Sequence, residues 1–218
     1  MWLLPGIGQL VPLYQSAANC VKWSVDFLSH RHAPLQLFPL HYHRFFRLSS
    51  LATEKLDNRR NLCYDKNVMA PYRLYFDGSC SPINPGGTAK YGFALFKEGV
   101  AEPVEIGHGT IGTGPGMTNN LAEFTALWRG LQAFLCLKGR AKHSNVLNCL
   151  GDSQLVVNIM NTTWHPHPEK SYFSAYRLAD EVCDRLWIDG NCLNFQWIPR
   201  EKNQFCDDLS GSGVFAWR

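Results

Sequence analysis

The sequence from residue 71 onward is a succession of short apolar segments, and the order of their periodicities limits the folds open to the chain. Alternating side chains predict strands over residues 72–77, 91–96 and 104–111, which we expect to form an antiparallel meander. Apolar residues then recur at helical spacing from residue 121 to residue 135. After them, the pattern predicts a strand over 146–150, helices over 153–160 and 171–187, and a last strand over 192–198.

This order, β-β-β-α-β-α-α-β, predicts an α/β fold with a five-stranded mixed sheet flanked by helices. Gly211-Ser-Gly213 follows the last acidic pair closely, so we expect the final helix, after Asp207, to be short or absent. Loops converge where strands end, and we expect the side chains that carry chemistry to lie there.

The first 68 residues show no periodicity that predicts a fold. We expect a poorly ordered N-terminal extension over 1–68, one domain over 69–211 and a C-terminal tail over 212–218. Met69-Ala70-Pro71 resembles a natural start, which favours an extension without a part in catalysis and a cytoplasmic protein. Alternatively, Arg-Phe-Phe-Arg-Leu-Ser-Ser over 44–50 is compatible with a transit peptide over 1–53, which would place the protein in mitochondria or another organelle.

The charge and cysteine patterns weigh against several classes of protein. The first 68 residues hold eight of the 21 lysines and arginines but only four of the 18 acidic residues, so the remainder is nearly neutral. A neutral domain argues against DNA binding that relies on many cationic contacts alone. The eight cysteines never form a C-x-x-C pair, which argues against a zinc site and is typical of a reduced, intracellular protein. No stretch is long enough to span a membrane.

Four acidic residues occupy positions where this order of elements would gather side chains: Asp77, Glu123, Asp152 and Asp207. Each has a structural explanation as well. Asp77-Gly78 is a common turn dipeptide, and Asn120-x-x-Glu123 fits a capping box at a helix start. Asp152 and Asp207 each fit the N-cap of a following helix.

The sequence context of these acids decides between the explanations. Four motifs of the ribonuclease H family are similar, in order and separation, to Asp77-Gly-Ser-Cys80, Thr118-Asn-Asn-Leu-Ala-Glu123, Asp152-Ser-Gln154 and Asn203-Gln-Phe-Cys-Asp-Asp-Leu-Ser210. The resemblance covers residues 71–211 and is to type 1 ribonuclease HI, in the archaeal and plant-like branch without a basic protrusion. It implies a ribonuclease H-like fold.

The resemblance also implies an activity and a cofactor. Members hydrolyse the RNA strand of RNA/DNA hybrids with two Mg²⁺ or Mn²⁺ ions, leaving a 5′-phosphate and a 3′-hydroxyl. Asp77, Glu123, Asp152 and Asp207 would hold the ions, because hard divalent cations prefer oxygen ligands. Cys206 takes the small-residue position of the last motif, so the ligand there is Asp207 and Asp208 faces solvent.

Small polar residues beside the four acids would contact the hybrid, since a ribose 2′-hydroxyl is recognised by such groups. By resemblance, the substrate-binding residues are Gly78, Ser79, Cys80, Asn84, Asn119, Asn120, Ser153 and Gln154. A plain loop at Asn84 and helix capping by Asn119 and Asn120 are the structural alternatives.

The chain departs from the family in two places. Residues 161–171 contain Lys170 as their one lysine or arginine, where some members have a basic protrusion, and residues 197–203 lack the histidine that other members carry. Arg200 and Lys202 are candidates to replace that histidine electrostatically. We expect a monomer that binds RNA/DNA hybrids, without an obligate protein partner and without a membrane. The alternatives are a non-cleaving hybrid or nucleic-acid binding module and a DNA-acting nuclease of the wider superfamily.

Overall fold

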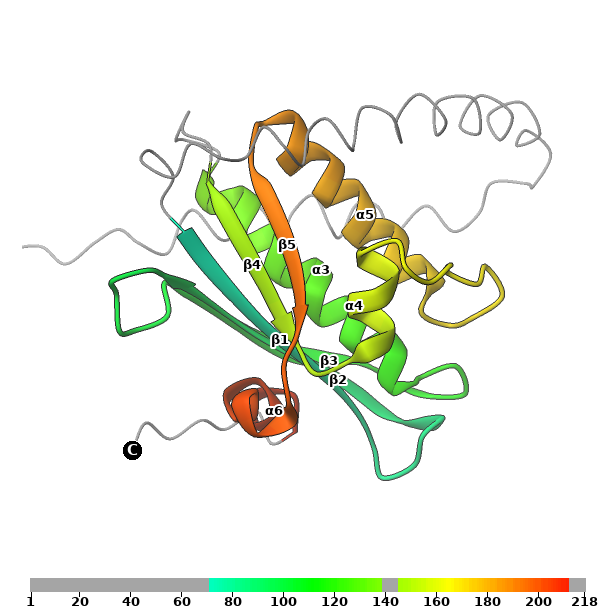
Figure 1. Cartoon of the computed structure of the whole chain (residues 1–218). Coiled ribbons are helices and arrows are strands. Elements are labelled where there is room, and N and C mark those ends of the chain that lie inside the picture. The colour runs from blue at the N-terminus through cyan, green and yellow to red at the C-terminus, as the bar shows by residue number, and fades with distance from the viewer. Residues whose placement is uncertain (1–70, 139–144, 212–218) are drawn as a thin grey trace, which may run out of the picture. The chain divides into compact units, whose positions relative to one another are not determined.

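The computed structural model describes residues 71–138 and 145–211. Its centre is a five-stranded sheet with the order β3-β2-β1-β4-β5 (Figure 1). The strands are β1 (Pro71–Ser81), β2 (Gly86–Lys97), β3 (Glu105–Gly114), β4 (Val146–Gly151) and β5 (Cys192–Trp197). The first three strands are antiparallel neighbours, whereas β4 and β5 run parallel to β1. The mixed sheet that the sequence predicts is therefore confirmed.

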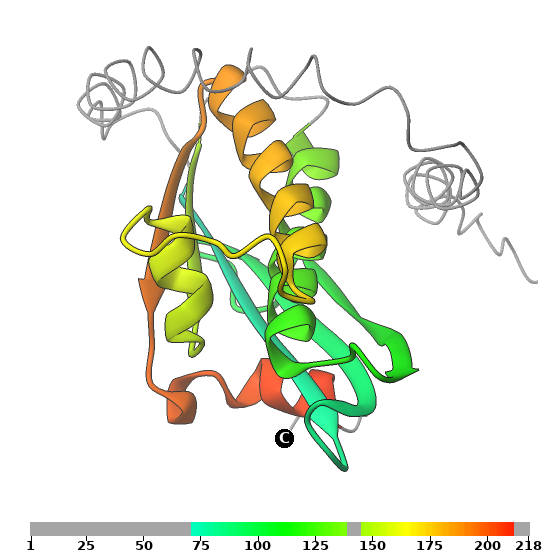
Figure 2. The same ribbon diagram turned by 90° about the vertical axis from the view of Figure 1, so that its right-hand side faces the viewer.

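The helices lie on both faces of this sheet. They are α3 (Asn119–Lys138), α4 (Gln154–Met160), α5 (Phe173–Ile188) and α6 (Gln204–Gly211), with a short 3₁₀ helix, η1 (Arg200–Lys202), before the last. Figures 1 and 2 show α3, α4 and α5 together on one face and α6 on the other. Stacking of the Phe124 ring on Tyr172, with centroids 5.2 Å apart, joins the start of α3 to the start of α5.

The core forms between the sheet and the three-helix layer. Leu74 and Phe76 of β1 are fully buried there, and so are Phe124, Leu127 and Leu131 of α3. These buried residues produce the apolar periodicities in the sequence, because an element that buries one face repeats its apolar residues with the period of a strand or a helix.

The opposite face of the sheet is covered by α6. Gly92 of β2 makes this approach possible, since a Cβ there would lie 2.6 Å from the Leu209 Cβ. Leu209 is buried over it, and the Lys90 Nζ donates a 2.9 Å hydrogen bond to the Gly211 carbonyl. The last helix is short, as expected, but it begins at Gln204, before Asp207, because Asn203 accepts the first helical hydrogen bonds through its carbonyl oxygen.

Two expectations are wrong, one about the end of the first strand and one about the cysteines. The first strand does not end at Asp77 but continues to Ser81, because Gly78 to Ser81 pair with Tyr91 to Thr88 of β2. Cys136 and Cys192 are disulfide-bonded, whereas Cys80, Cys149, Cys183 and Cys206 are free. Sequence spacing did not indicate the bonded state of two cysteines, because disulfides depend on proximity in three dimensions.

Within the described residues, no helix combines the length and the apolar character needed to cross a membrane. The expected N-terminal extension over 1–68 and the tail over 212–218 lie outside the described residues.

Candidate active site

Asp77 lies in the middle of β1, opposite Gly92 of β2, and is only 4% exposed. Its Oδ2 accepts a hydrogen bond from the hydroxyl of Ser210, a fully buried residue of α6. Burial raises the pKa of Asp77 to about 6, with smaller contributions from the negative charges of Asp152 and Asp207. The hydrogen bond from Ser210 acts in the opposite direction on this pKa. The fold therefore places a carboxylate where ionisation is costly.

Glu123 faces Asp77 from α3, and it is not part of a capping box. The helix begins at Asn119, and the Thr118 Oγ1 caps it by accepting the Leu121 backbone N–H at 3.1 Å. Glu123 therefore lies beyond the first turn, and its Oε2 is buried without a hydrogen-bond partner. Burial, together with the charges of Asp77 and Asp152, raises the pKa of Glu123 well above its usual range.

The closeness of these two acids depends on Gly78. A Cβ at this position would lie 2.2 Å from the Ala122 carbonyl carbon and from the Glu123 nitrogen. Only a residue without a side chain lets the α3 backbone rest directly on β1. The dipeptide Asp77-Gly78 therefore serves a helix contact rather than a turn.

Asp152 follows β4, which ends at Gly151, and Ser153 rather than Asp152 is the N-cap residue of α4. The N-cap explanation of Asp152 is therefore wrong. Two hydrogen bonds hold the residue: Asn203 Nδ2 donates to Asp152 Oδ1 at 2.9 Å, and Trp197 Nε1 donates to its backbone oxygen at 2.9 Å. Asn203 is 1% exposed and also donates to the Phe76 carbonyl at 2.9 Å, so one amide joins β1 to this carboxylate.

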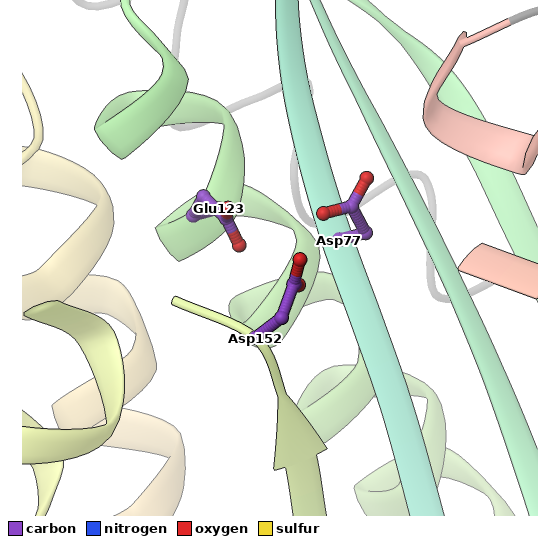
Figure 3. Close-up of side chains that lie close together, drawn as sticks. All are labelled: Asp77, Glu123 and Asp152. Atoms are coloured by element: carbon purple, nitrogen blue, oxygen red, sulfur yellow. The ribbon is translucent and has the colours of Figure 1, made fainter. Parts of the chain in front are cut away.

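Asp77, Glu123 and Asp152 converge, and one oxygen from each lies within 4.8 Å of the others (Figure 3). The three side chains come from a strand, a helix and a strand end that are distant in the sequence. Such a group of carboxylate oxygens has the donor chemistry that Mg²⁺ and Mn²⁺ prefer. The unpartnered Glu123 Oε2 supports the same fit, because a buried acceptor without a donor has a favourable use as a cation ligand.

Asp207 is near this cluster but outside that set of oxygens. It lies in the first turn of α6 rather than at its N-cap, and its Oδ1 forms an ion pair with the guanidinium of Arg200. This contact raises the pKa of Arg200. Asp208 lies next to it on the same helix and is exposed, in the position expected for a solvent-facing residue.

The candidate substrate residues occupy two kinds of environment. Ser79 donates to the Ser210 carbonyl at 2.7 Å, and the buried Cys80 thiol lies 3.3 Å from the Ile83 carbonyl, so both side chains make internal contacts. Asn84, Asn119, Asn120 and Gln154 are exposed, and Ser153 is partly buried. Asn84 Oδ1 accepts the Asn119 backbone N–H at 3.2 Å, which ties the loop after β1 to the start of α3.

No role was predicted from the sequence for three residues that support the acids: Ser210, Asn203 and Trp197. Asn203 directly precedes α6 and Ser210 lies within it, and both are buried like Cys206 and Leu209, so a polar residue at either position indicates a buried hydrogen bond. That signal was available in the sequence. Nothing in the sequence pattern indicated that the Trp197 indole donates to the Asp152 carbonyl.

Comparisons with known proteins identify this sheet order, with three converging carboxylates beside it, as the ribonuclease H fold. A protein-family model described as reverse transcriptase-like matches residues 104–213. The N-terminal ribonuclease H domain of Rv2228c from Mycobacterium tuberculosis superposes with a TM-score of 0.55 at 27% identity, covering 66% of this chain and 92% of that one. The chain belongs to the ribonuclease H family, within the reverse transcriptase-like group that the model describes.

Further relatives fit this assignment. Ribonuclease H1 from the halophilic archaeon Halobacterium salinarum has a TM-score of 0.52 at 27% identity, over 66% of this chain and 99% of that one. LC11-RNase H1, solved in complex with an RNA/DNA hybrid, has a TM-score of 0.53 at 25% identity, covering 63% of this chain and 92% of that one. The bifunctional protein Rv2228c of M. tuberculosis is 33% identical over 102 residues, which are 45% of this chain but only 24% of Rv2228c. The matched part is thus about a quarter of that curated relative.

Proposed function

We propose that this chain is a metal-dependent endonuclease that hydrolyses the RNA strand of RNA/DNA hybrids and leaves a 5′-phosphate and a 3′-hydroxyl. The observation that carries the proposal is the convergence of Asp77, Glu123 and Asp152 within 4.8 Å, in a chain of this family. Three acids held so close repel one another, and a cluster of this kind is stabilised when it binds cations.

In this proposal, Asp77, Glu123, Asp152 and Asp207 hold two Mg²⁺ or Mn²⁺ ions. Two such ions would supply activation of the attacking water and stabilisation of the leaving oxygen. The protein supplies the positioning: Asn203 orients Asp152, and the capped start of α3 fixes Glu123. Asp207 would join the set once its carboxylate left Arg200, whose guanidinium would then be available to a phosphate.

Four exposed polar residues support the proposed substrate class. Asn84, Asn119, Asn120 and Gln154 offer short side chains that suit hydrogen bonds to 2′-hydroxyls. The other expected substrate residues, Gly78, Ser79, Cys80 and Ser153, are buried or partly buried. LC11-RNase H1, a solved structure similar to this chain, was itself bound to an RNA/DNA hybrid. We therefore favour hybrid cleavage over cleavage of duplex DNA.

The test is cleavage of labelled RNA/DNA, RNA/RNA and DNA/DNA duplexes by the full chain with Mg²⁺ or Mn²⁺. We expect cutting of the RNA strand of the hybrid alone, and no cutting by Asp77→Asn or Asp152→Asn. Both variants should still fold and bind hybrid, since an amide fills the same space but is a poor ligand for Mg²⁺. Equal cutting of duplex DNA would favour the DNA-acting nuclease, and hybrid binding without cleavage by the wild type would favour the binding module.

A further inference from the structure

Ser210 presents a buried hydroxyl on α6, next to the candidate acids. Ser210 is 0% exposed, so it cannot touch a nucleic acid, and a buried hydroxyl must find a hydrogen-bond partner. Two acceptors are within reach: Asp77 Oδ2, and the Asp207 carbonyl at 3.2 Å. A hydroxyl has a single proton to donate, and the shorter contact to the carboxylate is the stronger one. The hydroxyl is therefore directed at Asp77.

The hydrogen bond from Ser210 gives the two oxygens of the Asp77 carboxylate different surroundings. Figure 3 shows one Asp77 oxygen turned toward Glu123 and Asp152 and the other turned toward the ribbon of α6. Ser210 donates to Oδ2 from α6, which leaves the remaining oxygen for the cluster. Without that donor, the carboxylate could rotate about its last bond, because this torsion is broad.

The position of Ser210 is itself fixed from β1. The Ser79 hydroxyl donates to the Ser210 carbonyl at 2.7 Å, and Lys90 Nζ donates to the next carbonyl, that of Gly211, at 2.9 Å. The contact from Ser79 holds Ser210 itself against the sheet, so the hydroxyl is presented to Asp77 in one orientation, whereas the contact from Lys90 reaches only Gly211. Ser210 thus has the features of a residue that orients a metal ligand.

We propose that Ser210 is a positioning residue for the metal site: its hydroxyl binds Asp77 Oδ2 and fixes the carboxylate so that the other oxygen faces the cation. The inference rests on the proposed metal-dependent function. It assigns to the C-terminal helix a role in metal affinity that does not depend on Asp207, although both residues lie on α6.

The experiment measures Mn²⁺ binding to the full chain by titration calorimetry, without nucleic acid, and then the Mg²⁺ dependence and KM of hybrid cleavage. For Ser210→Ala we expect an approximately 10- to 100-fold weaker Mn²⁺ affinity, the usual effect of losing a partner that orients a ligand. The half-saturating Mg²⁺ concentration should rise in parallel, while the KM for hybrid stays within about twofold. Ser210→Thr keeps a hydroxyl and should restore much of the affinity.

Two controls separate positioning from general loosening of α6. Lys90→Met removes the contact to Gly211 without touching Asp77, and Thr125→Val removes another buried hydroxyl, which donates to the Leu121 carbonyl at 2.7 Å. Both should bind Mn²⁺ like the wild type. If Lys90→Met weakens Mn²⁺ binding as much as Ser210→Ala does, the positioning role is overturned.

Folding of each variant is checked by thermal unfolding in the presence of a chelator. If Ser210→Ala does not fold, Ser210→Cys provides the test, because it keeps the volume and replaces the hydroxyl with a weak donor. A folded Ser210→Ala or Ser210→Cys protein with wild-type Mn²⁺ affinity contradicts the inference. Failure of the wild type to bind Mn²⁺, or equal binding by Asp77→Asn, would instead contradict the proposed function.

Discussion

Replacement of Asp77 by asparagine should stabilise the protein in the absence of metal while it abolishes cleavage. Burial raises the pKa of Asp77 from 3.8 to about 6, so at neutral pH the folded protein holds an ionised carboxylate at an energetic cost. A shift of roughly two units corresponds to about 3 kcal/mol. Asparagine keeps an oxygen that can accept from Ser210, so we expect a gain of about 1 to 3 kcal/mol at pH 7. The repulsion on Glu123 should also fall, since the Asp77 charge helps to raise its pKa.

The gain in stability from Asp77→Asn should depend on pH. Because the folded-state pKa of Asp77 lies above the unfolded value, its contribution to stability is present at low pH and is lost as the pH rises from about 4 to about 6. The two proteins should therefore be nearly equal near pH 4, and the variant should be the more stable near pH 7. Excess Mg²⁺ should reverse the order, because it binds only the wild type well.

Urea unfolding with a chelator at both pH values is the assay, and Asp208→Asn is the control. That substitution removes one negative charge from an exposed position of α6, so its effect should lie within about 0.5 kcal/mol. An Asp77→Asn protein that is no more stable than the wild type near pH 7 would show that burial of this carboxylate is not costly, and the reasoning would be refuted.

Three further predictions concern the last helix, the contact of α3 with β1, and the N-terminal segment. Asp207→Asn should lower the kcat of hybrid cleavage at least tenfold more than Asp208→Asn does. If Asp208→Asn had the larger effect on kcat, Asp207 would not be the ligand. Gly78→Ala should cost about 1 to 3 kcal/mol in urea unfolding, because its Cβ would meet the α3 backbone at 2.2 Å, whereas Gly211→Ala, with open space around it, should cost far less. The fragment 69–218 should fold and cleave hybrid as the full chain does; an insoluble or inactive fragment would show that the preceding segment belongs to the domain.

The elements with a local signal could be predicted from the sequence. Leu121, Phe124 and Leu127 predicted α3 because a helix that buries one side repeats its apolar residues with the helical period. The mixed sheet followed from the order of strands and helices. The start of α3 was misassigned, because Thr118, Asn119 and Asn120 can all cap a helix and only their geometry selects Thr118.

The prediction of a turn at Gly78 was wrong for a different reason. Asp-Gly is a frequent turn dipeptide, and the sequence does not state that another backbone passes at contact distance. Gly78 is instead required by the α3 backbone, which a Cβ would meet at 2.2 Å. A single sequence does not distinguish a glycine required by a close helix from a glycine required by a turn. Contacts between residues that are distant in the chain, such as Ser210 with Asp77, are hidden for the same reason.

Under the proposed function, the arrangement of charges would couple metal binding to folding. Asp77, Glu123 and Asp152 bring their oxygens within 4.8 Å of one another, and both Asp77 and Glu123 resist ionisation there. Arg200 faces Asp207 and lowers the pKa values of Asp77 and Glu123, but burial outweighs its effect on both. The cluster is therefore an unfavourable part of the fold that the apolar core sustains. A divalent cation bound by these oxygens would remove this cost, so the proposed metal would raise the stability of the domain as well as supply its chemistry.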